Sequence, residues 1–302
     1  MMSEHRPGFL LIDKEGGWTS HDVVAKVRRL TGSKKAGHAG TLDPMATGLV
    51  VVGLGRATRL LRFVQDLAKE YVARVAFGVA TDTLDADGAI LSREPMPVTL
   101  EDVEAVLPRF IGQIMQIPPM VSALRVDGRR LYELARAGQV VDRPPRPVHI
   151  YELEVVDFAP SDYPEATIRV VCGKGTYIRS LADDIAQALG GRAHLASLRR
   201  TRAGSLDVEL NGYRITDLEQ AAAEDRLESL VVLPAAGLAD LPSIEADAAT
   251  AEAVRHGRQF QGSFSAAQIE DDEPFRVLDQ FGELLAVYRK SGPQAVAEVV
   301  LL

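Results

Sequence analysis

The residues of this 302-residue chain best suited to chemistry lie in a glycine-rich segment that contains an imidazole and a carboxylate. The segment reads Gly37-His38-Ala39-Gly40-Thr41-Leu42-Asp43-Pro44-Met45-Ala46-Thr47-Gly48. Because glycine adopts backbone conformations that other residues avoid, the segment can fold into a tight loop close to a ligand. His38 and Asp43 are both titratable, and the Asp43–Pro44 step restricts the backbone beside the carboxylate. Taken alone, an Asp-Pro pair more often starts a turn than carries out catalysis.

Other stretches of the chain do not predict a cofactor or metal site. Residues 53–58, Gly-Leu-Gly-Arg-Ala-Thr, follow a predicted strand but lack the third glycine of a dinucleotide-binding fingerprint. The six histidines are scattered, and neither a phosphate-binding Gly-x4-Gly-Lys-Ser/Thr loop nor a zinc-binding spacing occurs. We therefore expect no cofactor and no metal. Cys172 stands between Val171 and Gly173 and is expected to be a packed strand residue rather than a nucleophile.

Composition predicts an ordinary globular protein of the cytoplasm. Apolar residues make up 46% of the chain and charged residues 25%, which are typical values for globular proteins. The single cysteine excludes an intrachain disulfide and fits a reducing compartment. No apolar run reaches the roughly 18 residues that a membrane-spanning helix needs, and the N-terminus has no signal-peptide core. We expect a cytoplasmic protein that has no membrane partner.

Charge is distributed unevenly along the chain. The net charge is −8, and residues 207–275 alone contain fifteen acidic and four basic residues. Residues 1–206 contain 27 basic and 24 acidic residues and are therefore mildly basic. This part includes two denser basic stretches, one from Arg125 to Arg146 and one from Lys174 to Arg202. Solvated basic surfaces would have the same composition, so charge permits an RNA partner without establishing one.

Hydrophobic patterns and turn residues predict an α+β fold around the 37–48 loop. Strands are expected at residues 9–12, 49–52, 71–79, 148–158, 166–172 and 204–210. Helices are expected after a cap at Thr19 or Ser20, over residues 57–67 and 177–189, and from Thr99, where Asp102 would complete a capping box. Residues 81–88 are expected to form a polar loop.

A domain boundary is predicted near residues 238–242, Leu-Ala-Asp-Leu-Pro. Beyond it, short alternating stretches at residues 275–278 and 283–288 are separated by turns, a pattern typical of a small β-rich barrel. We therefore expect two domains, residues 1–238 and residues 239–302.

The 37–48 loop resembles the signature loop of the TruB family of tRNA pseudouridine synthases. The resemblance extends in order over roughly residues 8–205, in blocks that include Asp13-Lys14, Lys69–Tyr71, Thr81–Gly88, Gln116–Pro119 with Ser122-Ala123, Tyr132–Arg136, Lys174–Arg179 and Ala193–Arg200. An ordered set of this length leaves little room for chance. Two positions depart from the family pattern: Glu15 stands where proline is usual, and Arg125 stands where lysine is usual.

The resemblance implies a role for each matching residue. Asp43, Tyr71 and Arg179 would be catalytic: the aspartate acts on the substrate, the tyrosine stacks on the flipped uracil, and the arginine pairs with the aspartate. His38 would fill the place in the T-loop stack that the flipped base leaves. The remaining substrate-binding positions that the resemblance implies are Lys14, Tyr177 and Leu198.

The resemblance also implies a fold and a reaction. The fold would be a pseudouridine synthase catalytic domain, with a mixed, mainly antiparallel sheet flanked by helices, followed by a PUA-like RNA-binding domain. The reaction would convert uridine 55 in the T-loop of tRNA to pseudouridine by base flipping. We expect a monomer that needs no guide RNA.

The residues themselves leave two alternative functions open. One is a tRNA-binding or tRNA-folding module without turnover, and the other is a pseudouridine synthase that acts on another RNA. The sequence also leaves the catalytic route open, because Asp43 could attack the base, attack the sugar C1′, or act as a base at the ribose.

Overall fold

The computed structural model describes residues 6–122, 125–126, 129–131, 139, 141–261 and 268–301. These residues form two compact units. The first unit contains the described residues up to Asp43, the segment Gly48–Leu67, and the described residues from Ala203 onward. The second contains Pro44–Thr47 and the described residues from Ala68 to Arg202. Ala123 and the family block Tyr132–Arg136 lie outside the described residues.

The first unit is built on a short antiparallel sheet. Strand β1 (Gly8–Lys14) pairs with β3 (Thr47–Leu54), and β2 (Ala36–His38) pairs with the same β3. Helix α1 (Ser20–Thr31) follows β1, and Thr19 caps it in a capping box with Asp22. The strands expected at residues 9–12 and 49–52 and the helix cap at Thr19 are therefore confirmed.

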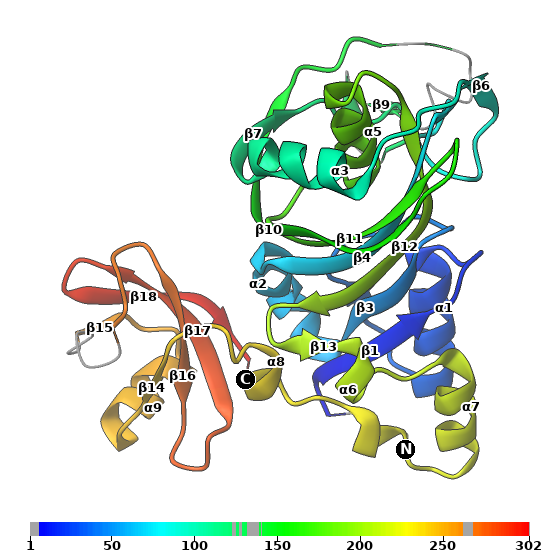
Figure 1. Cartoon of the computed structure of the whole chain (residues 1–302). Helices are drawn as coiled ribbons and strands as arrows, with labels where there is room; N and C mark the ends of the chain where they lie inside the picture. Colours follow the sequence, from blue (N-terminus) through cyan, green and yellow to red (C-terminus); the bar gives the residue numbers. More distant parts are fainter. Residues whose placement is uncertain are drawn as a thin grey trace. The chain divides into compact units, whose positions relative to one another are not determined.

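Short helices complete the part of the first unit that precedes the C-terminal sheet. The helix expected at residues 57–67 is a 3₁₀ helix, η1 (Gly55–Leu60), that continues into α2 (Leu61–Asp66). Later in the chain come α6 (Val208–Asn211), α7 (Ile215–Ala223), the 3₁₀ helix η3 (Leu227–Leu230) and α8 (Pro234–Gly237). Figure 1 shows α7 beside α1, and an ion pair between Lys26 and Glu219 joins these two helices.

The second unit contains a larger sheet with strand order β12 (Ala193–Ala203), β4 (Lys69–Phe77), β11 (Glu165–Cys172), β10 (Arg146–Ala159) and β7 (Gly112–Gln116). The pairs β4–β11, β11–β10 and β10–β7 are antiparallel. Figure 1 shows α3 (Leu100–Val106) and α5 (Ile178–Ala188) on the same side of β10 and β11. The remaining elements are the 3₁₀ helix η2 (Leu107–Phe110) and two antiparallel hairpins, β5 (Val79–Thr81) with β6 (Ile90–Arg93) and β8 (Arg125–Val126) with β9 (Arg129–Arg130).

The capping box predicted at Thr99 is confirmed. The backbone N–H of Asp102 donates to the Thr99 hydroxyl at 3.2 Å, and the backbone N–H of Thr99 donates to the Asp102 carboxylate at 2.9 Å. Two donors at the helix start are thereby satisfied without glutamate or glutamine at the third position. The helix expected at residues 177–189 is likewise confirmed as α5.

The strand expected at residues 204–210 is wrong. Only Leu206–Asp207 forms a strand there, β13, and Asp207 then caps α6 by accepting a hydrogen bond from the backbone N–H of Glu209 at 2.8 Å. The long strand is β12, immediately before this segment. The strand ends at Asp207 because aspartate is a preferred helix cap, and α6 begins at the next residue.

The C-terminal residues form a five-stranded sheet in the order β14 (Ser243–Glu245), β16 (Pro274–Leu278), β17 (Leu284–Ser291), β18 (Gln294–Val300) and β15 (Phe260–Gln261). The β14–β16 pair is parallel and the other pairs are antiparallel. Helix α9 (Ala248–Arg255) accompanies the sheet. The α+β class, the mainly antiparallel pairing and the β-rich C-terminal part are as the sequence predicts, while the boundary at residues 238 and 239 stays a prediction.

The C-terminal sheet contributes to two hydrophobic clusters. One cluster belongs to the sheet and α9, with Phe275, Tyr288 and Val254 fully buried in it. In the other, Val287 and Val299 join Leu60 and Phe63 of η1 and α2. Because this second cluster also contains Phe9 of β1, the sheet and the N-terminal part of the first unit share an apolar core.

Among the residues that the structure describes, every helix is too short or too polar to span a bilayer.

The shared core predicts that two valines of β18 differ in their effect on stability. Val299 is 4% exposed within the shared cluster, whereas Val296 on the same strand is 37% exposed. Val299→Ala should lower the free energy of unfolding by about 2 kcal/mol, because it removes two buried methyl groups and leaves a small cavity. Val296→Ala should change it by less than about 0.5 kcal/mol. Urea unfolding of both variants measures the difference, and equal losses would contradict the shared core.

Candidate active site

The loop that carries Asp43 is anchored by hydrogen bonds within the first unit. The hydroxyl of Ser20, the first residue of α1, donates to the carbonyl of Leu42 at 3.3 Å, and the backbone N–H of Leu42 donates to the same hydroxyl at 2.9 Å. Ser20 is fully buried and Leu42 is 3% exposed. A buried hydroxyl that both donates and accepts in this way fixes the backbone directly before Asp43.

The ends of the loop are held by strand pairing. His38 lies opposite Val52 in the β2–β3 pair, and the backbone N–H of Ala39 donates to the carbonyl of Val51 at 3.0 Å. Gly40 adopts a φ of 92°, which other residues rarely adopt, so glycine is required at this turn. Asp43 itself is half-buried, and the chain passes from the first unit to the second at the Asp43–Pro44 bond.

Two of the predicted binding residues lie in this loop or beside it. The imidazole of His38 packs edge-on against that of His21, with ring centroids 5.3 Å apart. Lys14 lies opposite Gly48, the residue at the far end of the loop, in the β1–β3 pair. Its ammonium is buried and donates to the carbonyls of Glu15 and Trp18 at 3.0 and 2.8 Å. Lys14 therefore stabilises the turn that contains Glu15, the position where the family usually has proline.

In the second unit, Tyr71 is a half-buried residue of β4 and lies opposite Val170 of β11. Its neighbour Glu70 accepts hydrogen bonds from the Thr201 hydroxyl at 2.7 Å and from Nε of Arg169 at 2.9 Å. Burial raises the pKa of Glu70, but these hydrogen bonds outweigh it, so the pKa is lowered overall and the carboxylate is ionised at neutral pH. The network joins β4 to β11 and β12 beside the tyrosine.

Tyr177 is positioned by an amide clamp. The side chain of Gln116 accepts from the backbone N–H of Tyr177 at 2.8 Å and donates to its carbonyl at 3.1 Å. Gln116 is 1% exposed at the end of β7, and Tyr177 is the residue that directly precedes α5. Ile117, the residue after Gln116, is also bound to α5, because the Ser180 hydroxyl donates to its carbonyl at 2.9 Å.

Arg179, on the first turn of α5, is a buried cation with several partners. Its guanidinium donates to the carbonyls of Thr83 and Val121 at 2.9 and 2.8 Å, and its Nη1 lies 3.3 Å from Oδ2 of Asp85. The side chains of Arg179 and Asp85 are only 3% and 8% exposed. These contacts offset the cost of removing a charged guanidinium from water, and they fix its orientation.

Asp85 is the anionic partner of Arg179, and sequence reasoning did not single it out. Its Oδ1 accepts from the Thr83 hydroxyl at 2.5 Å and from the backbone N–H of Asp87 at 3.2 Å, which leaves Oδ2 for Arg179. Residue Leu84 adopts a φ of 63°, an uncommon value for a branched side chain. The signal was present, because residues 81–88 form a family block, but the block contains three aspartates and does not reveal which one faces an arginine.

The two remaining predictions concern β12 and β11. Leu198 of β12 is 7% exposed, and its carbonyl accepts from the Thr47 hydroxyl at 3.5 Å. Cys172 is 1% exposed in β11, and burial raises the pKa of its thiol to about 11, so it is protonated at neutral pH. Cys172 is thus a packed strand residue, as the sequence predicts.

Comparison with known proteins places this chain in a known enzyme class. The family described as TruB family pseudouridylate synthase (N terminal domain) matches residues 28–178, and the tRNA pseudouridylate synthase B C-terminal domain matches residues 179–236. The structure is similar to that titled Crystal Structure of a Cbf5-Nop10-Gar1 Complex, with a TM-score of 0.79 and 26% identity, over 100% of this chain and 87% of that chain.

Curated relatives agree with this match. A protein of Ralstonia pickettii is 46% identical over 254 residues, which is 83% of this chain and 79% of the relative. One from Solibacter usitatus is 41% identical over 295 residues, covering 97% of this chain and 96% of the relative. Both relatives are named tRNA pseudouridine synthase B. The fold and the family match together define a pseudouridine synthase, which is an isomerase. Within that class, the chain belongs to the TruB family of tRNA pseudouridine synthases.

The buried Arg179–Asp85 pair predicts a measurable loss when its charge is removed. Asp85→Asn should lower the free energy of unfolding by about 2 kcal/mol, because it removes the anionic partner of a buried guanidinium. Asp87→Asn is the matched control, since Asp87 is exposed in the same loop, and it should change stability by less than about 0.5 kcal/mol. Denaturant unfolding near pH 7 measures both variants. Equal stability of Asp85→Asn and the unmodified protein would show that the pair does not hold Arg179.

Proposed function

We propose that this enzyme converts uridine 55 in the T-loop of tRNA to pseudouridine, with Asp43 as the catalytic group. The observation that supports the proposal most strongly is the anchored loop. Asp43 follows a residue that is hydrogen-bonded twice to Ser20, within the segment that resembles the signature loop of the family. The names of the relatives support tRNA as the substrate, since proteins covering as much as 97% of this chain are called tRNA pseudouridine synthase B.

The reaction needs few groups. Pseudouridylation breaks the bond between C1′ and N1 of the uridine, turns the uracil within the site, and joins C1′ to C5. The proton on C5 then leaves and N1 gains one, so the product is an isomer of the substrate and nothing is oxidised. An ionised Asp43 can serve as the nucleophile or as the base in this sequence. The chemistry calls for no cofactor.

Access to the glycosidic bond requires the uridine to leave the T-loop stack. Flipping a base out of a stack costs a few kcal/mol, and stacking on an aromatic side chain returns about 1–3 kcal/mol. We assign the stacking role to Tyr71, whose strand is held in place by the Glu70 network. His38 would fill the space that the base leaves and so reduce the cost of unstacking.

The remaining residues would hold the substrate and tune the carboxylate. Arg179 would pair with Asp43 and favour its ionised form, as a neighbouring guanidinium lowers the pKa of a carboxyl group. Tyr177 and Leu198 would line the uridine pocket, and Lys14 would support the substrate-binding loop. Residues 239–302 would form a PUA-like domain that binds tRNA, and the enzyme would act as a cytoplasmic monomer without a guide RNA.

A tRNA-folding module without turnover is the alternative from a different class. Such a protein would need the RNA-binding surfaces but no buried Arg179–Asp85 pair and no anchored carboxylate. The presence of both favours the enzyme, although an enzyme that flips bases could also help tRNA to fold.

The direct test uses the pure protein and an unmodified tRNA transcript, with no other macromolecule and no added cofactor. Chemical mapping of pseudouridine should find one modified position, uridine 55. Modification elsewhere would disprove the site, and absence of modification would disprove the activity. A transcript with cytidine at position 55 is the control and should stay unmodified.

The proposed role of Tyr71 predicts that its ring and its hydroxyl can be separated. Tyr71→Phe keeps the aromatic face, so tRNA affinity should be unchanged. If the hydroxyl removes the proton from C5, its loss should slow that step by about 100- to 10,000-fold. Single-turnover release of tritium from C5-labelled uridine measures the step, beside equilibrium binding.

Tyr71→Leu is the matched variant, because it removes the ring as well as the hydroxyl. It should lose affinity for the uridine pocket together with activity. A Phe variant that releases tritium as fast as the unmodified enzyme would limit Tyr71 to stacking and leave the C5 proton to water or another group.

A further inference from the structure

Three arginines at three-residue intervals on η1 and α2 contact the end of the C-terminal sheet. Nη1 of Arg56 donates to the carbonyl of Leu301 at 3.1 Å, and Nη1 of Arg59 donates to the carbonyl of Val300 at 2.7 Å. Arg62, one turn further along, forms an ion pair with Glu298 of β18. Arg56 and Arg59 thus bind backbone carbonyls at the end of β18, whereas Arg62 binds a carboxylate.

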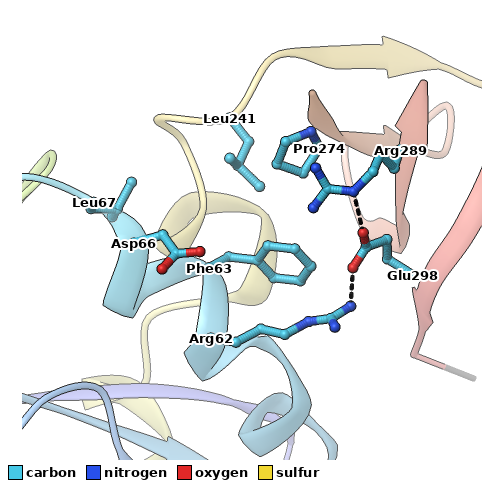
Figure 2. Close-up of a pocket in the computed structure, with 8 residues that line it drawn as sticks. All are labelled: Arg62, Phe63, Asp66, Leu67, Leu241, Pro274, Arg289 and Glu298. Carbon is cyan, nitrogen blue, oxygen red and sulfur yellow. Dashed lines mark hydrogen bonds and ion pairs between the residues drawn. The ribbon is translucent and has the colours of Figure 1, made fainter. Parts of the chain in front are cut away.

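Arg62 and Glu298 lie in an open groove between α2 and the C-terminal sheet, which we call the α2–β18 groove. It consists of two cavities of about 290 and 420 Å³ that share Arg62, Arg289 and Glu298 in their walls. In the smaller one, Phe63, Leu67, Leu241 and Pro274 provide an apolar wall and Asp66 a polar edge (Figure 2). The charged residues of the larger one are three cations and two carboxylates: Arg62, Arg289 and Lys290 against Asp272 and Glu298.

The centre of the groove is an anion held between two guanidiniums. One carboxylate oxygen of Glu298 accepts from Arg62 and the other from Arg289, as the dashed lines in Figure 2 show. The side chain of Glu298 is 17% exposed, whereas that of Arg62 is 52% exposed and partly covers the Phe63 ring, 4.7 Å from its centroid. An anion that enters from solvent therefore meets Arg62 before it meets Glu298.

Two planar guanidiniums that converge on one anionic group suit a phosphate as well as a carboxylate, because both present oxygens at the spacing of the guanidinium fork. The groove is open and its larger part is lined mainly by charged side chains, which suits a solvated polyanion better than an enclosed small molecule. Across both cavities three cations face three carboxylates, so the two converging guanidiniums, and not an excess of positive charge, favour this occupant.

We propose that the α2–β18 groove binds backbone phosphates of the tRNA in a part of the molecule other than the T-arm, and that Glu298 occupies the anion position when no RNA is bound. This inference rests on the proposed function for the identity of the RNA. Arg62 and Arg289 are the phosphate ligands, and the negative charges of Glu298 and Asp272 limit the strength of the contact.

The test compares full-length tRNA with the isolated T-arm stem-loop in equilibrium binding at several salt concentrations. Arg62→Gln should weaken binding of full-length tRNA several-fold and reduce the slope of log affinity against log salt by about 1, the effect of one lost phosphate contact. Glu298→Gln should have the opposite effect, with tighter binding of full-length tRNA. Neither change should alter binding of the stem-loop.

Two further variants distinguish phosphate binding in the groove from an effect of the protein's overall charge and from loss of the contact between the sheet and α2. Asp272→Asn removes an exposed negative charge from the groove without touching the Arg62–Glu298 pair, and it should also tighten binding of full-length tRNA. Glu283→Gln is the control, because Glu283, directly before β17, pairs with Arg6 near the N-terminus and does not line the groove, and it should leave affinity unchanged.

If Glu298→Gln weakens the binding of full-length tRNA as Arg62→Gln does, the ion pair only holds the C-terminal sheet to α2, and the proposal is wrong. Equal affinity of all variants, or equal changes with the stem-loop, would also overturn it. Pseudouridine formation in the stem-loop is measured in parallel. Its absence with the unmodified enzyme would count against the proposed function and not against the groove.

Discussion

The two hydrogen bonds between Ser20 and Leu42 are the constraint on which the active-site loop depends. Ser20 is fixed because it begins α1 directly after the Thr19 capping box. Leu42 is fixed in turn because its backbone N–H and carbonyl both bond to the Ser20 hydroxyl. Leaving a buried donor or acceptor unpaired costs about 1–3 kcal/mol each, so the loop is strongly held in this arrangement. In the proposed mechanism, Asp43, the next residue, would need little reorganisation before it acts, which is how a preorganised group contributes to catalysis.

The second unit holds its proposed functional residues by the same principle of satisfying buried polar groups. Gln116 bonds both backbone groups of Tyr177, and Asp85 with two carbonyls surrounds Arg179. Each of these contacts joins segments far apart in the sequence, so the site is built by tertiary structure rather than by any one motif. The C-terminal sheet follows the pattern too, since Arg56 and Arg59 satisfy carbonyls at the end of β18 while valines of the sheet complete an apolar core.

Most of the fold follows from local sequence signals, and the exceptions have identifiable causes. Buried strands such as β1 and β3 are continuous apolar runs, and the capping residues Thr19 and Thr99 indicate where helices begin. The sequence does not predict a strand over β12, because this segment contains three arginines and few large apolar side chains. The strand predicted at residues 204–210 is cut short because Asp207 caps a helix. The family resemblance supplied the candidate site, but Asp85 and the partners of Arg62 could not be predicted. Their contacts depend on which distant segment folds beside them.

The central claim is that Asp43 carries the chemistry that the anchored loop prepares. The most direct measurement is single-turnover pseudouridine formation in full-length tRNA by Asp43→Asn, beside the equilibrium affinity of the variant for the same tRNA. The amide keeps the size and polarity of the side chain but is neither a nucleophile nor a base. We expect no detectable pseudouridine, with affinity within a few-fold of the unmodified enzyme. Pseudouridine formation at more than a trace rate would show that Asp43 is a turn residue and that another group performs the reaction.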